Sequence, residues 1–224
     1  MNVLAHTEAH IPSPASSYVE LFAQIAALQA KGDYHGLIQT AERADLAVTS
    51  DNHPTRLLIT LPLVLSCMIV NDLLAEPSAK FALLRLSDAV ASLPLARAML
   101  NLFASVWERR YENVYSRCEA VLNLAQQGDS LHTEVTGVFT SLVTAFIESF
   151  RQRTISLLSK AYSTIPFAIA QAYLGLPTEE LLSLASEKGW HFDAATHVMT
   201  PARVACKISS SASAQSTALS LKRC

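Results

Sequence analysis

The sequence predicts an all-α helical-repeat arm followed by a small α+β module of the winged-helix type. Apolar residues recur at helical spacing from residue 17 to residue 163, prolines and Gly-Asp pairs interrupt that spacing, and two short alternating stretches follow it. Half of the 224 residues are hydrophobic and only 16% are charged, which supplies the apolar surface that a folded core requires. We therefore expect residues 17–150 to form the arm and residues 151–201 to form the module.

A helical hairpin is expected at the start of the arm. The first apolar stripe consists of Tyr18, Leu21, Phe22, Ile25 and Leu28. Gly32 and Asp33 interrupt this stripe, and helical spacing resumes at Tyr34. The break between two amphipathic stripes predicts two antiparallel helices.

Prolines mark the next helices, which are expected at about residues 55–76, 78–92 and 94–107. Pro54, Pro77 and Pro94 stand at or before these starts, where a helix tolerates proline. The first of the three contains the longest uncharged apolar run, residues 57–70, which includes Pro62 as a candidate kink. A membrane-spanning helix needs about 20 such residues, so the run predicts a buried core helix and no membrane partner.

Two amphipathic helices close the arm. One apolar stripe runs from Tyr111 to Leu122 and ends before Gly128, and a strong one runs from Val135 to Phe150. Tyr34 and Tyr111 each open a helix with the same spacing of apolar residues and a glutamate, as stacked helical hairpins would produce. An equally acceptable interpretation is that any two amphipathic helices share such spacing.

Three helices and a β-hairpin are expected in the module. The helices lie around residues 155–162, 166–175 and 178–188, and Gly189 ends the third. Residues 190–193 and 197–200 alternate like two strands joined by a three-residue turn at 194–196. This order is that of a helix-turn-helix with an added wing.

Alternation along the hairpin assigns its side chains to two roles. Trp190 is expected in the winged-helix core with Leu181 and Val198. The candidate partner-binding residues are Phe192, His197 and Met199, because an exposed strand edge can pair with a strand of another protein. A place in the core is left open as the alternative for Phe192 and Met199.

Both ends of the chain, residues 1–16 and 202–224, are expected to be flexible. The C-terminal segment is rich in serine, and its basic residues Arg203, Lys207, Lys222 and Arg223 have no acidic residue to balance them. Its few apolar side chains bury too little area to offset the entropy lost on ordering.

The sequence carries no signature of an enzyme or a metal site. H-E-x-x-H, G-x-S-x-G and glycine-rich phosphate loops are all missing. His191, Asp193 and His197 are the nearest approach to a ligand cluster, since alternation places all three on one face of the hairpin. Polar residues on the open face of a wing are the commoner explanation, so no catalytic, cofactor-binding or metal-binding residue is assigned.

The charge pattern disfavours nucleic acid as a partner. Seventeen basic residues against nineteen acidic ones give a net charge of −2, and the third helix of the module carries Glu179, Glu180 and Glu187 against one lysine. These acids would meet the phosphate backbone in the usual docking of a winged helix. A winged-helix DNA-binding protein is therefore the alternative of another class, and not the favoured one.

The expected location is the cytoplasm and the nucleus. The first residues show no basic segment before an apolar core, unlike a secretory signal. The four cysteines form no C-x-x-C pair and are widely separated, which fits free thiols in a reducing compartment.

Three stretches of the sequence suggest a family. Residues 159–182, which contain L-G-L-P-T-E-E, and residues 187–193, which contain G-W, together with the hairpin closed by Pro201, resemble the C-terminal module of PCI-domain proteins. Residues 106–115, led by Trp107, resemble the helix-to-helix junction that precedes this module in one branch of the family. That branch comprises one subunit each of the COP signalosome, the proteasome lid and eukaryotic initiation factor three, and the likeness covers about residues 17–201.

The resemblance implies a scaffold whose partners are other PCI-type subunits of a large hetero-oligomeric complex. Winged helices of such subunits associate side by side, partly through hairpin edges, and a C-terminal helix joins a shared bundle. The favoured function is a non-catalytic subunit of the COP signalosome, the complex that removes a ubiquitin-like modifier from cullin ubiquitin ligases, with the lid and initiation-factor subunits as alternatives. Residues 202–224 depart from the family because they lack a clear apolar stripe.

Overall fold

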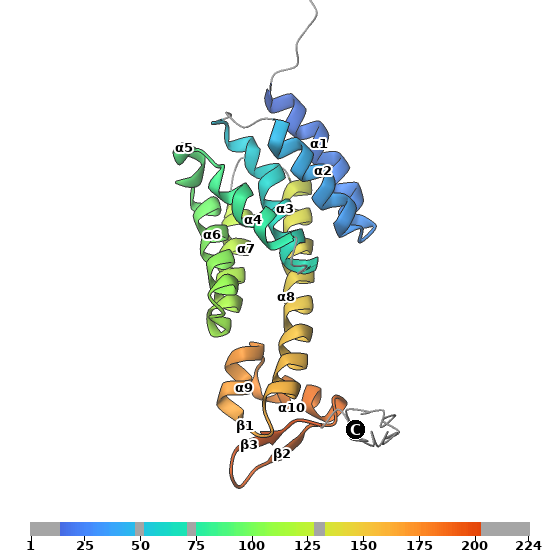
Figure 1. Cartoon of the computed structure of the whole chain (residues 1–224), viewed down its shortest axis with the longest axis vertical. Coiled ribbons are helices and arrows are strands. Elements are labelled where there is room, and N and C mark those ends of the chain that lie inside the picture. Colours follow the sequence, from blue (N-terminus) through green and yellow to red (C-terminus); the bar gives the residue numbers. More distant parts are fainter. Residues whose placement is uncertain (1–13, 48–51, 71–74, 128–132, 203–224) are drawn as a thin grey trace, which may run out of the picture.

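The computed structural model describes residues 14–47, 52–70, 75–127 and 133–202. It is mostly helical, with one small three-stranded antiparallel sheet near its C-terminal end (Figure 1). In chain order the elements are α1 (Pro14–Ala30), α2 (Tyr34–Ala47), the 3-10 helix η1 (Pro54–Arg56), α3 (Leu57–Val70), α4 (Ala75–Leu84), α5 (Asp88–Ala91), α6 (Pro94–Trp107), η2 (Tyr111–Asn113), α7 (Val114–Gln127), α8 (Thr133–Ala161), β1 (Ile165–Pro166), α9 (Phe167–Leu174), α10 (Thr178–Glu187), β2 (His191–Asp193) and β3 (Val198–Thr200).

Both predictions of flexible ends fall mainly outside the described residues. Residues 1–13 and 203–224 are not described. Residues 14–16, which were assigned to the flexible N-terminus, instead belong to α1.

The hairpin of α1 and α2 has the predicted break. Gly32 takes a left-handed φ of 70°, and the amides of Gly32 and Asp33 donate to the carbonyls of Gln29 and Leu28. These bonds satisfy the last carbonyls of α1 and turn the chain. Asp33 then accepts from the amide of Gly36 at 2.9 Å, which satisfies a free amide at the start of α2.

The middle of the arm is α3, which is apolar around its whole circumference. Every residue from Leu57 to Met68 is buried, including Pro62 inside the helix. A helix that is hydrophobic on all sides must be covered on all sides, and α3 packs against α1, α2, α4 and α8. Among the described residues, no helix is both long enough and apolar enough to cross a membrane.

A buried carboxylate ties three segments of the arm together. Asp45 at the end of α2 accepts from Arg56 of η1 at 2.9 Å and from the Nε of Arg85, after α4, also at 2.9 Å. Asp45 and Arg56 are 2% and 1% exposed. The two guanidinium groups supply the countercharge that a carboxylate needs in a dry interior.

One long helix runs from the arm into the module. The sequence pattern suggested a change after Arg151, with separate helices on either side, but α8 continues without interruption from Thr133 to Ala161 (Figure 1). The apolar side chains of α8 belong to two different cores. Phe150 is the last residue of the arm core, and Ile155 is the first residue of the module core. The two cores therefore share a helix and change between these two residues.

The module contains one strand that the sequence analysis missed. β1 pairs antiparallel with β3, which in turn pairs with β2, so the sheet order is β1-β3-β2. β3 is thus the central strand, and β2 forms one edge of the sheet. The helices α9 and α10 lie beside this sheet at the end of α8 (Figure 1).

Candidate interaction surface

An aromatic cluster joins the module to the arm. The ring of Tyr111 lies edge-on to Phe150 and Tyr173, with centroids 5.4 Å and 6.0 Å away, and Tyr115 lies edge-on to Phe150 at 6.0 Å. Edge-to-face geometry at these distances is favourable beyond the area that the rings bury. The cluster draws on η2, α7, α8 and α9, so it connects both cores.

Polar contacts accompany these rings. The hydroxyl of Tyr115 donates to the carbonyl of Tyr173 at 3.2 Å, and the Nε of Arg151 donates to the carbonyl of Leu174 at 3.1 Å. The guanidinium of Arg151 also lies over the ring of Tyr115, 5.6 Å from its centroid. Burial raises the pKa of Tyr115 from its ordinary value of 10 to about 12, so its hydroxyl remains a hydrogen-bond donor even in alkaline solution.

The tightest fit in this junction is at Gly175, which follows α9. Its φ is 59°, in the left-handed region, and its amide donates to the carbonyl of Gln171 at 2.9 Å. A Cβ at this position would lie 2.4 Å from the Tyr115 ring. The glycine of the L-G-L-P stretch therefore lets α9 end and lets the chain pass directly against the ring.

Leu181 and Trp190, two residues that the sequence assigned to the winged-helix core, are 1% and 7% exposed. They belong to one apolar cluster with Ile165 and Met199. The third, Val198, is only half-buried and lies outside that cluster.

Met199, a candidate partner-binding residue for which a place in the core was left open, is 0% exposed, so the structure contradicts partner binding and shows the core alternative. The reason is the length of the hairpin turn, which has four residues and includes His197. With His197 in the turn at φ 53°, the strand begins one residue later and each side chain moves to the opposite face. Met199 is the cross-strand partner of Phe192. It consequently faces the core and takes the place expected for Val198.

The other two candidate partner-binding residues remain accessible to different degrees. Phe192 is half-buried, with its ring 5.0 Å from Phe167 and 6.3 Å from His197, measured between centroids. His197 is exposed in the turn, and its carbonyl accepts from the amide of Phe167 at 2.9 Å. His197 therefore holds the start of α9 against the turn and does not present a strand edge.

The polar face of the hairpin is organised by Asp193. Its carboxylate accepts from the hydroxyl of Thr196 at 2.7 Å and from the amide of Ala195 at 2.9 Å, and these bonds lower its pKa. His197 lies beside Phe192, so the structure does not gather it with His191 and Asp193 as the alternation had suggested. In the described ranges, no three His, Cys, Asp or Glu side chains could hold a metal ion together.

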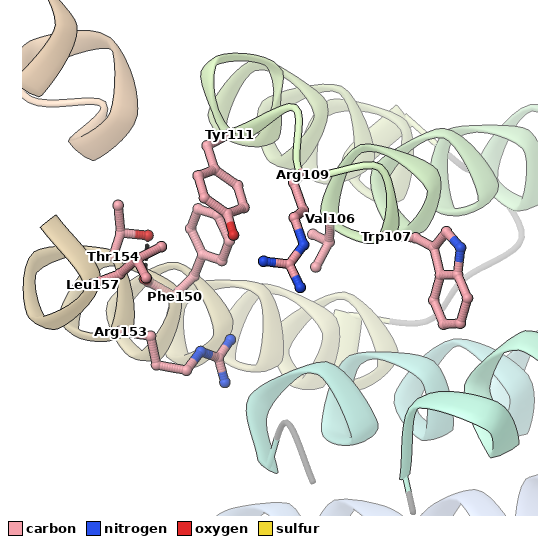
Figure 2. A pocket seen from close by; sticks show the side chains of 8 residues that line it. All are labelled: Val106, Trp107, Arg109, Tyr111, Phe150, Arg153, Thr154 and Leu157. Carbon is pink, nitrogen blue, oxygen red and sulfur yellow. Dashed lines mark hydrogen bonds between the residues drawn. The ribbon is translucent and has the colours of Figure 1, made fainter. Parts of the chain in front are cut away.

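A cleft of about 450 Å³ opens where α6 and η2 face the second half of α8. Figure 2 shows the guanidinium of Arg109 between these elements, with Val106 and Tyr111 beside it. Trp107 and Leu157 line the cleft and are 49% and 43% exposed. Arg153, which also lines it, donates to the carbonyls of Met68 and Ile69 at 2.9 Å and so binds the end of α3.

No sequence motif singles out Arg109 as a functional residue. It lies within the Trp107-led junction, but α6 ends without a glycine, and glycine is the signal by which such turns are found.

These features define a class of protein, one built from packed helices with a small antiparallel module fixed to the end of its longest helix. Its described surface offers exposed apolar side chains and a strand edge. The chain belongs to the CSN8/PSMD8/EIF3K family, whose model matches residues 55–207. This match confirms the resemblance to that branch of the PCI-domain proteins.

Two similar proteins are both named as the same subunit of one complex. The chain is similar to the COP9 signalosome complex subunit 8 of Dictyostelium discoideum, with 28% identity over 95 residues that cover 42% of this chain and 48% of the relative. It is also similar to the COP9 signalosome complex subunit 8 of Xenopus laevis, with 27% identity over 96 residues that cover 43% of each chain. The matched segment thus spans less than half the length of either relative.

Proposed function

We propose that this chain is a non-catalytic scaffold subunit of the COP9 signalosome, present in the cytoplasm and the nucleus. The observation that carries the proposal is its membership of the family together with two relatives that bear the name of that complex. In this role it contributes binding surface to an assembly that removes a ubiquitin-like modifier from cullin ligases, and another subunit supplies the chemistry.

The C-terminal module is proposed to be a winged helix. The second half of α8, β1, α9, α10 and the β2–β3 hairpin follow one another in the order helix, strand, helix, helix, hairpin. That order supports a helix-turn-helix with a wing, and β1 would add a third strand to its sheet.

Other PCI-type subunits are the proposed partners, and β2 is the proposed contact. β3 is paired on both sides, by β1 and by β2, so the sheet can extend past β2. A partner strand that pairs there gains main-chain hydrogen bonds without any catalytic side chain. In the assembled complex the amides of residues 191–193 should then exchange with deuterium more slowly than in the free chain.

Nucleic acid fits the module poorly. Glu179, Glu180 and Glu187 of α10 are all exposed, and this is the helix that would enter a DNA groove. Their charges would oppose the phosphates, so the DNA-binding alternative is not proposed.

Affinity purification of the tagged full chain tests the proposal. Co-purification of signalosome subunits in comparable amounts is expected, whereas lid or initiation-factor subunits would identify one of the two alternatives instead. Unchanged hydrogen exchange of residues 191–193 in the purified complex would contradict the proposed contact while leaving membership intact.

A further inference from the structure

The cleft between α6 and α8 is lined by apolar side chains and by arginines, with no acidic residue among them. Its volume of about 450 Å³ falls within the range of roughly 300–1,000 Å³ that is usual for binding clefts. Two of its walls, Trp107 and Leu157, remain about half exposed. The cleft therefore combines apolar contact area with positive charge.

Arg109 is the charged group available to a ligand. Its side chain is exposed, and the guanidinium makes no hydrogen bond, ion pair or ring contact with any residue of the described segments. The neighbouring Arg110 differs, because its Nε is bound to Glu108 at 2.9 Å. Figure 2 shows the guanidinium of Arg109 between the turn that follows α6 and the helix α8, and Arg109 is one of the residues that line the cleft.

Arg109 occupies a position in a left-handed turn that glycine fills at the ends of two other helices. Arg109 has φ 59°, and the amides of Arg109 and Arg110 donate to the carbonyls of Val106 and Ser105. The same two backbone hydrogen bonds close the ends of α1 and α10. There the left-handed residues are Gly32 and Gly189, respectively. Glycine is preferred at this position of the turn, so arginine here runs against the local conformational preference.

We propose that this cleft binds a peptide segment of a partner protein in which an acidic side chain stands next to a large apolar one. The planar guanidinium of Arg109 would pair with the carboxylate through two hydrogen bonds. Leu157, which is 43% exposed on the α8 side of the cleft, would contact the apolar neighbour, a contact that an isolated inorganic anion could not make. The chain's own residues 202–224 do not fit, because they contain four basic residues and no acidic one.

Binding of the purified full chain to a positional library of ten-residue peptides tests this inference. The test does not depend on the proposed assembly. The wild-type protein should select Asp or Glu beside Leu, Phe or Trp. Arg109→Glu should invert the charge preference to Lys or Arg, and Arg109→Gly should lower retention of the selected peptides at least tenfold. Arg117→Glu, on the exposed surface of α7 and outside the cleft, is the matched control and should leave the selection unchanged.

Thermal unfolding separates binding from folding. Arg109→Gly should unfold at a higher temperature than the wild type, because glycine relieves the left-handed residue, while its peptide selection is lost. The inference would be overturned if the wild type and Arg109→Glu selected the same peptides. It would also be overturned if the wild type selected no peptides at all. Loss of selection in Arg109→Gly together with a lower unfolding temperature would equally count against it, because Arg109 would then act on the fold.

Discussion

Replacing Gly175 by alanine should measure how strongly the arm and the module are coupled. The left-handed φ of 59° costs an alanine about 1–2 kcal/mol, of which roughly 0.4–1 kcal/mol is recovered because alanine loses less entropy on folding. The added methyl group must also displace the ring of Tyr115, which would lie 2.4 Å away. Overpacking of this kind costs about 1–3 kcal/mol, so Gly175→Ala should lower the free energy of unfolding by about 3 kcal/mol in total, at the middle of these ranges.

The chain contains a matched control for the backbone contribution. Gly32 has φ 70°, close to that of Gly175, but a Cβ built on Gly32 meets no atom within 4 Å. Gly32→Ala should therefore lose only about 1 kcal/mol, the net cost of the left-handed conformation. The difference between the two variants is the cost of the contact with Tyr115.

Urea unfolding of the full chain provides the measurement, and a double-mutant cycle with Tyr115→Leu isolates the contact. In the Tyr115→Leu background, Gly175→Ala should cost about as little as Gly32→Ala, because the ring is gone. Equal losses for the two glycine variants in the wild-type background, with no coupling in the cycle, would refute the close fit between α9 and α7.

Three further predictions concern the two cores. Trp190→Ala should destabilise the protein by about 3–5 kcal/mol, since the indole is buried; lost partner binding at an unchanged melting temperature would instead mark it as an interface residue. Asp45→Asn should cost about 3–5 kcal/mol in urea unfolding, because it leaves Arg56 buried without its countercharge, and a loss below about 1 kcal/mol would contradict that role. Burial raises the pKa of Cys67 and Cys118 to about 12, so both thiols stay protonated when folded, and stability should fall as the pH rises from about 9 towards 12. Mass spectrometry should find both unmodified by iodoacetamide at pH 9 until the protein is unfolded, and rapid modification of the native protein would contradict their burial.

The helices of the arm could be predicted because their ends carry local chemical signals. Gly32 and Asp33 end the first hairpin helix, and Pro94 opens α6 at the residue where the structure begins it. The separate helices expected on either side of residue 151 are one helix in the structure. Arg151 and Arg153 both bind main-chain carbonyls of other segments while α8 continues through them. Only the tertiary structure reveals these acceptors.

The module was less predictable because its strands are short. β1 has two residues, one of them Pro166, which is too short for any alternation. The hairpin itself was found, but a turn longer by one residue exchanged the roles of Val198 and Met199. In a three-residue strand the sequence pattern cannot fix the register, whereas the burial of Met199 against Ile165 does.

The junction also constrains the orientation of β2, the strand proposed to contact a partner, relative to the arm. If α8 alone connected the module, bending between Phe150 and Ile155 would turn β2 freely relative to the arm, because the two cores separate there. The bonds from Tyr115 and Arg151 to the end of α9 add constraints on the other side of the same hinge. Their loss would redirect β2 before either core unfolds, since none of these groups lies in the sheet. A folded Gly175→Ala protein should consequently bind its assembly more weakly, even though residue 175 lies outside the edge that makes the proposed contact.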